Sequence, residues 1–415
     1  MKRSGRTRTT VLRGLSATIL ILLMAFGGVQ TWSATVSQLM IAGLVFLWCW
    51  RMNNRSGWRL KGTALDAPVW LFVALAGVST YFSIYPYASL LALAQVLGCV
   101  AGYYLAVNGL DRQRRMQFFI VIILAGTALS LLGIGQSLLH LNNSWWSNRH
   151  WLSATFVNHN HFAGFLEMAM ALALGFLLGL GREDVNSAFE LKQWRFLIGC
   201  ALVVMITAFV MAKSRGGWGS FSIAMLCGCA VLVRRQRLPK WTLWAFVGGL
   251  LFFVLFLGLG EDRVAYRLHT LSDGEQKSLT SRMEIVRHSL PIVRDHPWTG
   301  TGIGTFRWAF PRYRPPGLSV TFHYVHNDYL QIATETGLLA VPIMLWGIIV
   351  ILRHGFCRQK GEPRLPEMTR LGAGVGMLSL MLHGLVDFNF HIPANMLVFA
   401  CLAGTLECDT VRRGT

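Results

Sequence analysis

Histidine is the side chain best suited to proton transfer near neutral pH, and the chain contains 12 histidines. One of them opens the polar string His326-Asn327-Asp328 at the start of a predicted helix, with Glu335 about two turns further on. We interpret His326 as a candidate general base that Asp328 could orient, and we expect Asn327, Asp328 and Glu335 to bind substrate. The alternative is that His326 caps the helix without a catalytic role.

A second candidate is the tight turn Ser214-Arg215-Gly216-Gly217, which follows Lys213. Arginine is planar and permanently charged, so one side chain can bind two oxygens of a phosphate group. The glycines would let backbone N–H groups approach the same anion. The turn therefore predicts an anion site formed by Arg215 and Lys213. The alternative is that Arg215 only anchors the chain at a membrane surface.

Three more arginines, Arg282, Arg287 and Arg294, lie on or near a predicted helix. Ser281 and Glu284 have the spacing of a capping box, which indicates where this helix begins. Arg282 and Arg287 are candidate contacts to the same anion. The alternative is that these arginines form a solvated helix face.

Two further motifs combine histidine with other polar side chains. His159 and His161 lie two positions apart at the start of a predicted helix, and Asp387 and His391 lie in a polar turn near the carboxyl end. No cysteine or carboxylate accompanies the histidine pair at the spacing of a metal site. We therefore expect both histidines to line a substrate pocket and predict no metal. Asp387 and His391 either bind substrate or form a hydrogen-bonded structural plug.

The composition shows what kind of molecule must position these residues. Of its 415 residues, 53% are hydrophobic and only 14% are charged, and the mean hydropathy is +0.47. A soluble chain carries about 25% charged residues, so the composition excludes an ordinary soluble enzyme, a disordered chain and a coiled coil. It predicts an all-α polytopic integral membrane protein.

Twelve stretches are long and apolar enough to be expected as transmembrane helices. A retained first helix is favoured over a cleaved signal peptide, because a second span begins at once. The chain is thus expected to comprise nine spans with short loops in 1–260, one large partly helical external loop in 261–327, and three spans with a short tail in 328–415. The twelve predicted spans are 11–30, 33–50, 67–83, 88–107, 117–139, 161–181, 196–212, 217–233, 241–260, 328–352, 371–386 and 394–408.

The distribution of basic residues predicts how these spans are oriented. The chain has 38 Lys and Arg against 19 Asp and Glu, a net charge of +19. If the amino terminus is cytoplasmic, 26 of the 38 basic residues fall on the cytoplasmic side. This is the positive-inside pattern, and it places both termini in the cytoplasm. The excess charge therefore orients the chain and does not indicate a nucleic-acid partner. Arg215, Arg282 and most of the histidines then lie on the external face.

These motifs together carry a resemblance to a known family. The strings are Ser214-Arg215-Gly216-Gly217, Pro297–Gly304, His326–Leu330 followed by Glu335-Thr336-Gly337-Leu338, and Gly384–Asn395. With about twelve spans and a large external loop before the tenth, the chain resembles the bacterial O-antigen ligase and O-antigen polymerase superfamily.

The resemblance implies a specific chemistry. Members transfer glycans from a polyprenyl diphosphate carrier, usually undecaprenyl diphosphate, at the periplasmic face of the inner membrane, and they need neither metal nor cofactor. Ligases use lipid A–core as the acceptor, whereas polymerases use the next repeat unit. Arg215 and Arg282 match the arginines implicated with the diphosphate, and His326 matches the histidine implicated with the acceptor. Arg287, Arg294 and Arg307 are the alternatives to Arg282. The implied reaction is metal-independent and inverts the anomeric centre.

Two alternatives stay open. An O-antigen or exopolysaccharide polymerase of the same superfamily shares these motifs, because they do not specify the acceptor. A lipid or polysaccharide transporter is the alternative from another class, and it predicts ionisable residues near the middle of the membrane. The predicted spans are nearly free of charge and polar residues gather on one face, which favours an enzyme acting at that face.

Overall fold

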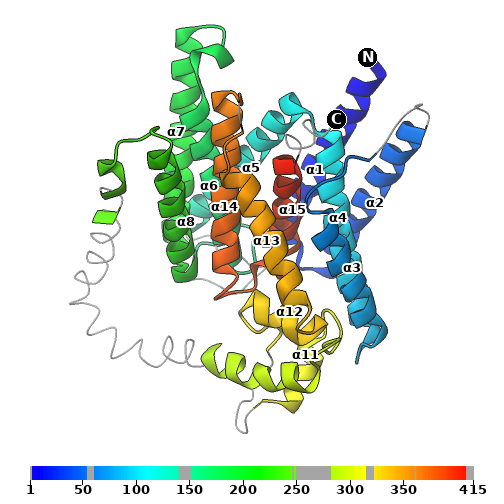
Figure 1. Cartoon of the computed structure of the whole chain (residues 1–415). Helices are drawn as coiled ribbons and strands as arrows, with labels where there is room; N and C mark the ends of the chain where they lie inside the picture. The colour runs from blue at the N-terminus through cyan, green and yellow to red at the C-terminus, as the bar shows by residue number, and fades with distance from the viewer. Residues whose placement is uncertain are drawn as a thin grey trace, which may run out of the picture.

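A computed structural model describes residues 2–53, 60–139, 151–244, 247–248, 282–314, 322–359 and 361–407. Within these ranges the chain forms helices and connecting turns, and no strand is present. The predicted all-helical class is therefore confirmed. Most of the long helices run side by side, and the helices between residues 282 and 336 gather below one end of them (Figure 1).

Seven of the helices in the described ranges are long and apolar enough to cross a membrane, and three shorter ones are also apolar. These findings support several spans but do not establish the predicted twelve, and most of the predicted span 241–260 lies outside the described residues. A further helix occupies 282–295. The main helices are α1 (Lys2–Met24), α2 (Thr31–Asn53), α3 (Asp66–Tyr81), α4 (Pro86–Gly109), α5 (Arg112–Leu138), α6 (His159–Gly179), α7 (Ala188–Met211), α8 (Arg215–Arg234), α11 (Phe306–Ala309), α12 (Asp328–Thr336), α13 (Ala340–Phe356), α14 (Arg364–His383) and α15 (Pro393–Glu407).

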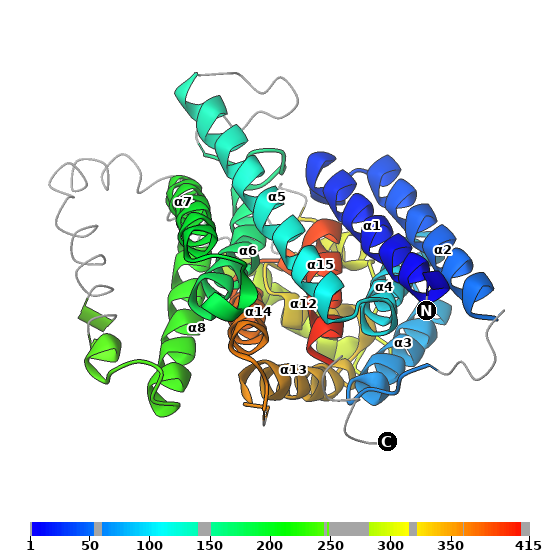
Figure 2. The same cartoon turned by 90° about the horizontal axis from the view of Figure 1, so that it is seen from above.

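Helices α6 and α14 form the centre of the bundle. Seen from above, α7 and α8 lie on one side of this pair and α1 to α4 lie on the other (Figure 2). The two central helices approach closely at glycines: a Cβ atom on Gly372 would lie 2.4 Å from the backbone oxygen of Ala171. Small residues allow such close helix packing in a membrane, where burial of apolar surface gives little driving force. The central pair is therefore a firm support for side chains at its ends.

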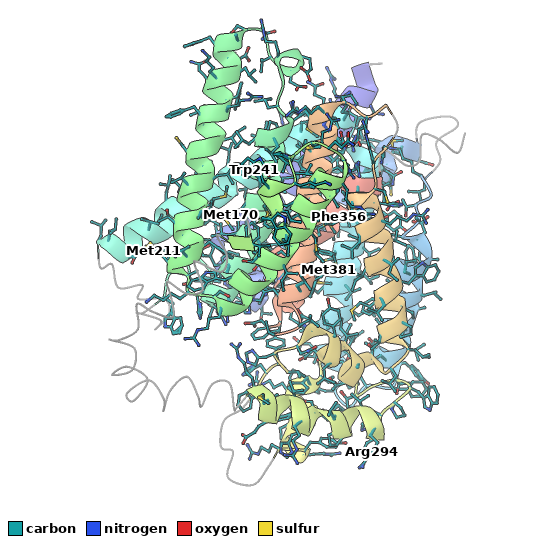
Figure 3. The ribbon with its side chains drawn as sticks, turned by 60° about the vertical axis from the view of Figure 1, so that its left-hand side comes forward. Met170, Met211, Trp241, Arg294, Phe356 and Met381 are labelled. Atoms are coloured by element: carbon teal, nitrogen blue, oxygen red, sulfur yellow. The ribbon has the colours of Figure 1, made fainter. Side chains whose placement is uncertain are left out.

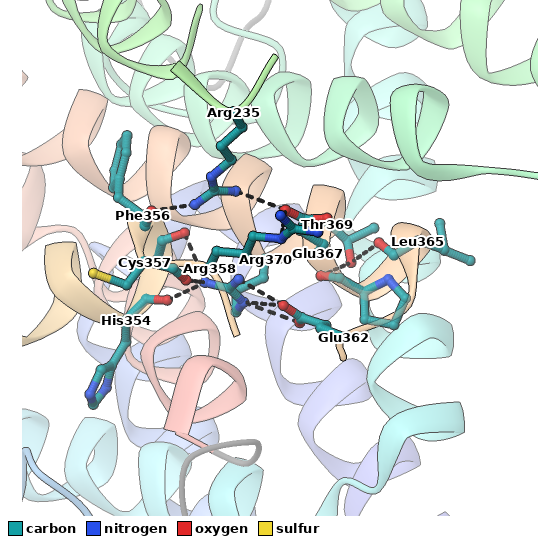
Figure 4. A network of polar contacts seen from close by, with 12 residues as sticks. Arg235, His354, Phe356, Cys357, Arg358, Glu362, Leu365, Glu367, Thr369 and Arg370 are labelled. Atoms are coloured by element: carbon teal, nitrogen blue, oxygen red, sulfur yellow. Dashed lines mark hydrogen bonds and ion pairs between the residues drawn. The ribbon is translucent and has the colours of Figure 1, made fainter. Parts of the chain in front are cut away.

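One end of the bundle carries a network of charged side chains. Arg235 contacts Glu367 at 3.2 Å, and Arg370 contacts Glu362 at 2.7 Å and donates to the carbonyl of Cys357 at 2.6 Å (Figure 4). Because each buried charge here has an opposite charge nearby, the network offsets the cost of removing these groups from water. The start of α1 and the end of α15 lie at the same end (Figure 1). That this end faces the cytoplasm stays a prediction.

At the opposite end of the bundle, the structure contradicts one predicted span. The sequence predicted a single helix over 328–352, but the structure has two helices, α12 and α13, separated at Gly337. Gly337 has φ +85°, and a Cβ atom there would lie 2.3 Å from the carbonyl oxygen of Trp298. Only glycine tolerates both the conformation and the close approach. The break sets α12 beside the 282–295 helix and α11, below the long helices (Figure 1).

Candidate functional site

Asp387 is the centre of the candidate site. Its carboxylate is 1% exposed and accepts a hydrogen bond from the Asn160 amide at 2.7 Å. Oδ1 lies 3.7 Å from Nε2 of His161 and 3.7 Å from Nδ1 of His326, and Oδ2 lies 3.9 Å from the guanidinium of Arg282. These partners come from α6, the segment before α12 and the 282–295 helix. One buried carboxylate thus joins elements far apart in the sequence.

The charge state of Asp387 follows from these neighbours. Burial acts to raise the pKa of this carboxyl, but the imidazoles of His161, His326 and His383 outweigh burial and hold its pKa well below the usual range. Asp387 is therefore an anion near neutral pH. The side chains of Arg282 and His326 are 34% and 22% exposed, so a substrate can reach them although Asp387 is covered.

Asp387 and its partners Asn160, His161, His326 and Arg282 form what we call the Asp387 group. An aromatic layer separates the Asp387 group from a second pair of polar residues. The ring of Phe388 contacts the His161 and His326 rings, with centroids 4.5 and 4.9 Å away, and stacks on Tyr324 at 4.2 Å. Beyond Tyr324 lies His391, whose ring centroid is 5.2 Å from that of Tyr324. The turn between α14 and α15 therefore presents polar groups on both of its sides.

The partner of His326 differs from the one predicted. Asp328 was expected to orient His326, but its Oδ1 lies 2.7 Å from Nδ1 of His391, and its backbone N–H donates to Gly384. The reason is local: Asn327 caps α12, so Asp328 occupies the first helical position and points at the 384–391 turn. Burial acts to lower the pKa of His391, but Asp328 raises it. The carboxylate that faces His326 is Asp387.

His326 itself has an unusual backbone conformation. Its φ is +61°, in the left-handed region that costs a non-glycine residue free energy and persists only where the surroundings impose it. The neighbouring Asn327 fixes the segment from both sides, because its side chain accepts from Leu330 N–H and donates to the Leu385 carbonyl, each at 2.9 Å. Asn327 thus positions His326, and its contact with substrate stays a prediction.

The turn that carries Arg215 packs against the segment before Asp387. Ser214 caps α8 by accepting from Gly217 N–H at 3.2 Å, and Arg215 is the first, exposed residue of that helix. A Cβ atom on Gly216 would lie 2.9 Å from the Val386 side chain, and Arg282 donates to the Val386 carbonyl at 3.4 Å. Val386 therefore touches the elements that carry both candidate arginines.

The remaining residues of this turn lie close by. Lys213 is exposed and has φ +54°. His159 donates from Nδ1 to the carbonyl of Ala212 at 2.6 Å, and its ring packs on Trp151. His159 thus holds the turn in place through its hydrogen bond to Ala212, whereas His161 faces Asp387.

Arg287 and Arg294 differ from Arg282, although all three belong to the 282–295 helix. Both are exposed, and Arg294 contacts Asp295 at 3.3 Å. Figure 3 shows Arg294 near the outer edge of the structure, away from the central helix that carries Met381. Arg282 contacts Asp387, whereas no contact between Arg287 and Asp387 is present among the described residues.

Glu335 forms buried hydrogen bonds that hold a loop against α12. Its buried carboxylate accepts hydrogen bonds from the backbone N–H groups of Gly304 and Phe306, at 2.8 and 3.2 Å, and from the Gln331 amide at 2.7 Å. Burial raises the pKa of Glu335 against these hydrogen bonds. Glu335 thus ties the glycine-rich 300–304 loop to α12, and its contact with substrate stays a prediction.

We expect Gly300→Ala to loosen this loop. Gly300 has φ +64°, and a Cβ atom there would lie 2.2 Å from the carbonyl carbon of Glu335, so the loop would have to move. The left-handed conformation alone costs about 1–3 kcal/mol for a non-glycine residue. Thermal unfolding in detergent should show a lower midpoint. Gly98→Ala is the control, because no heavy atom lies within 4 Å of its Cβ position; an unchanged midpoint in Gly300→Ala would contradict this account.

Two residues of the site escaped the sequence analysis. Glu167 is fully buried about two turns into α6, where it contacts His383 Nδ1 at 2.7 Å and accepts from Ser379 at 2.6 Å. Asn160 donates to Asp387. A lone carboxylate in an apolar helix is costly unless it is partnered or functional, and that was the available signal for Glu167.

In the described residues, no group of three or more His, Cys, Asp or Glu side chains is arranged to hold a metal ion. The positive charge of the candidate site comes from arginines, and its titratable groups are histidines beside carboxylates. Such a set of side chains can bind an anion and transfer a proton.

The fold and this site define a multi-pass helical membrane protein with a polar site at one end of its helices. Residues 200–345 match the family model described as O-antigen ligase. The match covers about a third of the chain and supports the O-antigen ligase superfamily of membrane glycosyltransferases, of the ligase or polymerase type. None of the curated proteins compared with the chain matches it. The matched range includes Arg215, Arg282 and His326, whereas Asp387 lies beyond it.

Proposed function

We propose that this protein transfers a glycan from undecaprenyl diphosphate to a hydroxyl group of lipid A–core, at the periplasmic face of the bacterial inner membrane. The observation that carries the proposal is the convergence of His326 and Arg282 on the buried carboxylate of Asp387. A group that can accept a proton and a group that can bind an anion thus lie near the two oxygens of one carboxylate. The family match supports the class of reaction.

The arginines would act on the donor. When the bond between the sugar and the diphosphate breaks, negative charge grows on the departing oxygen. Arg282 and Arg215 would stabilise this charge, and they would do so without reorganising if the fold already holds them in place. The backbone N–H groups at the start of α8 would add to the field at Arg215. We propose no metal and no cofactor, because the two arginines supply the positive charge.

His326 would act on the acceptor. Nδ1 faces Asp387, so Nε2 is the atom that would take the proton from the acceptor hydroxyl. The acceptor oxygen then forms a bond to the anomeric carbon while the bond to the diphosphate breaks on the opposite side, which inverts the configuration. Asp387 would fix the orientation of the ring and stabilise the imidazolium that results. The 3.7 Å separation can shorten when substrate binds, as catalytic contacts commonly do.

The charge distribution supports the location. The basic residues counted as cytoplasmic number 26 of 38, and the chain's charged network lies at the end that holds the start of α1 and the end of α15. The positive-inside rule places that end in the cytoplasm. The Asp387 site lies at the other end and would then face the periplasm.

The proposal is tested with the full-length protein in proteoliposomes that contain an undecaprenyl-diphosphate-linked glycan. Lipid A–core and a second carrier-linked repeat unit are offered as acceptors in separate reactions. Product on lipid A–core supports the ligase. Product on the carrier-linked repeat would identify a polymerase instead, and no product with either acceptor would refute the proposal.

In this assay, we expect Arg215→Ala and Arg282→Ala each to lower kcat by about 10²-fold or more, because each removes a charge that stabilises the transition state. Arg294→Ala is the control, since Arg294 is 81% exposed and contacts only its neighbour Asp295 among the ion pairs described. The reaction is expected to proceed with a chelator present. Near-normal transfer by Arg215→Ala, or inhibition by the chelator, would contradict the proposed roles.

A further inference from the structure

A cavity of about 690 Å³ lies between α2, α3, α4, α13 and α15. Aliphatic and aromatic side chains form most of its wall, and it extends from Trp308 at one end to Ala403 towards the other. Val29, Tyr87 and Leu91 line it and are 40%, 62% and 41% exposed, so the cavity reaches the surface of the bundle. Its volume is in the range of small-molecule binding sites, which are commonly about 300–1,000 Å³.

One end of this cavity is polar and carries positive charge. Arg307 and His323 line that end, together with the Asp328–His391 pair and Glu335. The Glu335 carboxylate is buried and bound by the backbone N–H groups of Gly304 and Phe306, whereas Arg307 is exposed. The exposed Arg307 guanidinium lies 5.9 Å from the ring centroid of Trp308. Burial and the charge of Arg307 lower the pKa of His323, so Arg307 supplies the positive charge near neutral pH. An apolar cavity with a cationic end matches an amphipathic molecule with an anionic head group.

The cavity is separate from the Asp387 group but adjacent to it. Arg215, Arg282, His326 and Asp387 are not among the residues that line it. The boundary is the stacked pair of Tyr324 and Phe388, because Tyr324 lines the cavity and Phe388 contacts the His326 ring. A head group in the cavity would therefore approach His326 from the side away from Arg282.

We propose that this cavity binds the hydrocarbon chains of the acceptor lipid, and that Arg307 contacts a phosphate or carboxylate on its head group. The inference rests on the proposed function. Displacement at the anomeric carbon requires the acceptor and the leaving group on opposite faces of the sugar. With the diphosphate at Arg215 and Arg282, the acceptor must come from the other side of the Asp387 turn, which is the side of this cavity.

Gly347→Phe tests the proposal by filling the cavity. Gly347 lines the cavity on α13, and the nearest heavy atom to its Cβ position is 4.0 Å away on Pro68, so a side chain fits without a clash at its root. Gly199→Phe on α7 is the matched control, because no heavy atom lies within 4 Å there and α7 lies on the other side of the bundle (Figure 2). Both changes replace a helical glycine, so they affect helix propensity alike.

Steady-state transfer in proteoliposomes is measured with the donor and the lipid acceptor varied in turn. Gly347→Phe is expected to raise KM for the acceptor at least about tenfold, since losing the burial of about two methylene groups changes affinity by that much. KM for the donor should stay unchanged, and Gly199→Phe should match the wild type. A rise in the donor KM instead would assign the cavity to the donor chain and overturn the proposal, as would no change in either.

A binding experiment separates this proposal from the proposed function. Lipid A–core with a photoreactive acyl chain is crosslinked to the full-length protein without donor, and the labelled peptides are mapped. Labels on α4 and α13 that are lost in Gly347→Phe are the expected result, whether or not the wild type transfers a glycan. Labels confined to other helices would overturn the cavity assignment even if transfer is normal.

Discussion

His326→Ala is expected to lower the rate of transfer by about 10²–10⁴-fold, which is the usual contribution of a general base. The substitution removes the imidazole that faces Asp387 at 3.7 Å but leaves the backbone free to keep its φ of +61°. Any strain in that conformation is present in both proteins, so the fold should persist. The measurement is kcat with saturating donor and acceptor, and the midpoint of thermal unfolding checks the fold.

His288→Ala is the matched control, because His288 belongs to the 282–295 helix and has no part in the Asp387 group. His326→Gln is a second variant, since glutamine keeps a polar side chain but cannot accept the proton. Both His326 variants should lose activity while His288→Ala retains it. Substantial activity in His326→Gln would mean that another group acts as the base.

Much of the fold was predictable because it depends on local patterns. The predicted spans 88–107, 117–139 and 217–233 lie within five residues of α4, α5 and α8 at each end, because the apolar runs there end at charged or polar residues. The break at Gly337 was not predictable in this way. It depends on the Trp298 carbonyl approaching from a segment that hydropathy does not connect to α12.

The candidate site, like the fold, was only partly predictable from the sequence. The sequence identified Arg282, His326 and Asp387 as chemically suitable residues, and the structure brings all three together. It did not identify the pairing, because proximity in sequence suggested Asp328 as the partner of His326. Helix geometry directs Asp328 to His391 instead, and only the packing of the α14–α15 turn brings Asp387 to His326.

The buried pair Glu167 and His383 bears on the transporter alternative, which predicts ionisable residues inside the membrane. The pair is satisfied within the protein, since Glu167 also accepts from Ser379, and a Cβ atom on Gly217 would lie 3.0 Å from the Glu167 carboxylate. His383 accepts from the backbone N–H of Asp387 through its carbonyl at 3.0 Å. The pair thus links the Arg215 turn to the Asp387 turn, which is a supporting role in a site at one end of the bundle.

Asp387→Asn is expected to affect both activity and stability. Asparagine keeps the shape of the side chain but removes the charge, and it offers one acceptor oxygen where Asp387 accepts from both Asn160 and the Phe388 N–H. One buried donor is then left without a partner, which costs about 1–3 kcal/mol. Loss of the charge that holds the His326 ring should lower kcat by roughly 10²-fold or more. Asp295→Asn, an exposed carboxylate beside Arg294, is the control.

The effect of Asp387→Asn on the free energy of unfolding is expected to depend on pH. The pKa of Asp387 is depressed in the folded protein, so its ionised form contributes stability at pH values above the unfolded pKa of about 3.9, and that contribution is lost as the pH falls through the lower folded value. The difference in unfolding free energy between wild type and Asp387→Asn should therefore shrink as the pH falls below about 4. A difference in unfolding free energy that stays the same below about pH 4 would mean that the charge of Asp387 does not stabilise the fold.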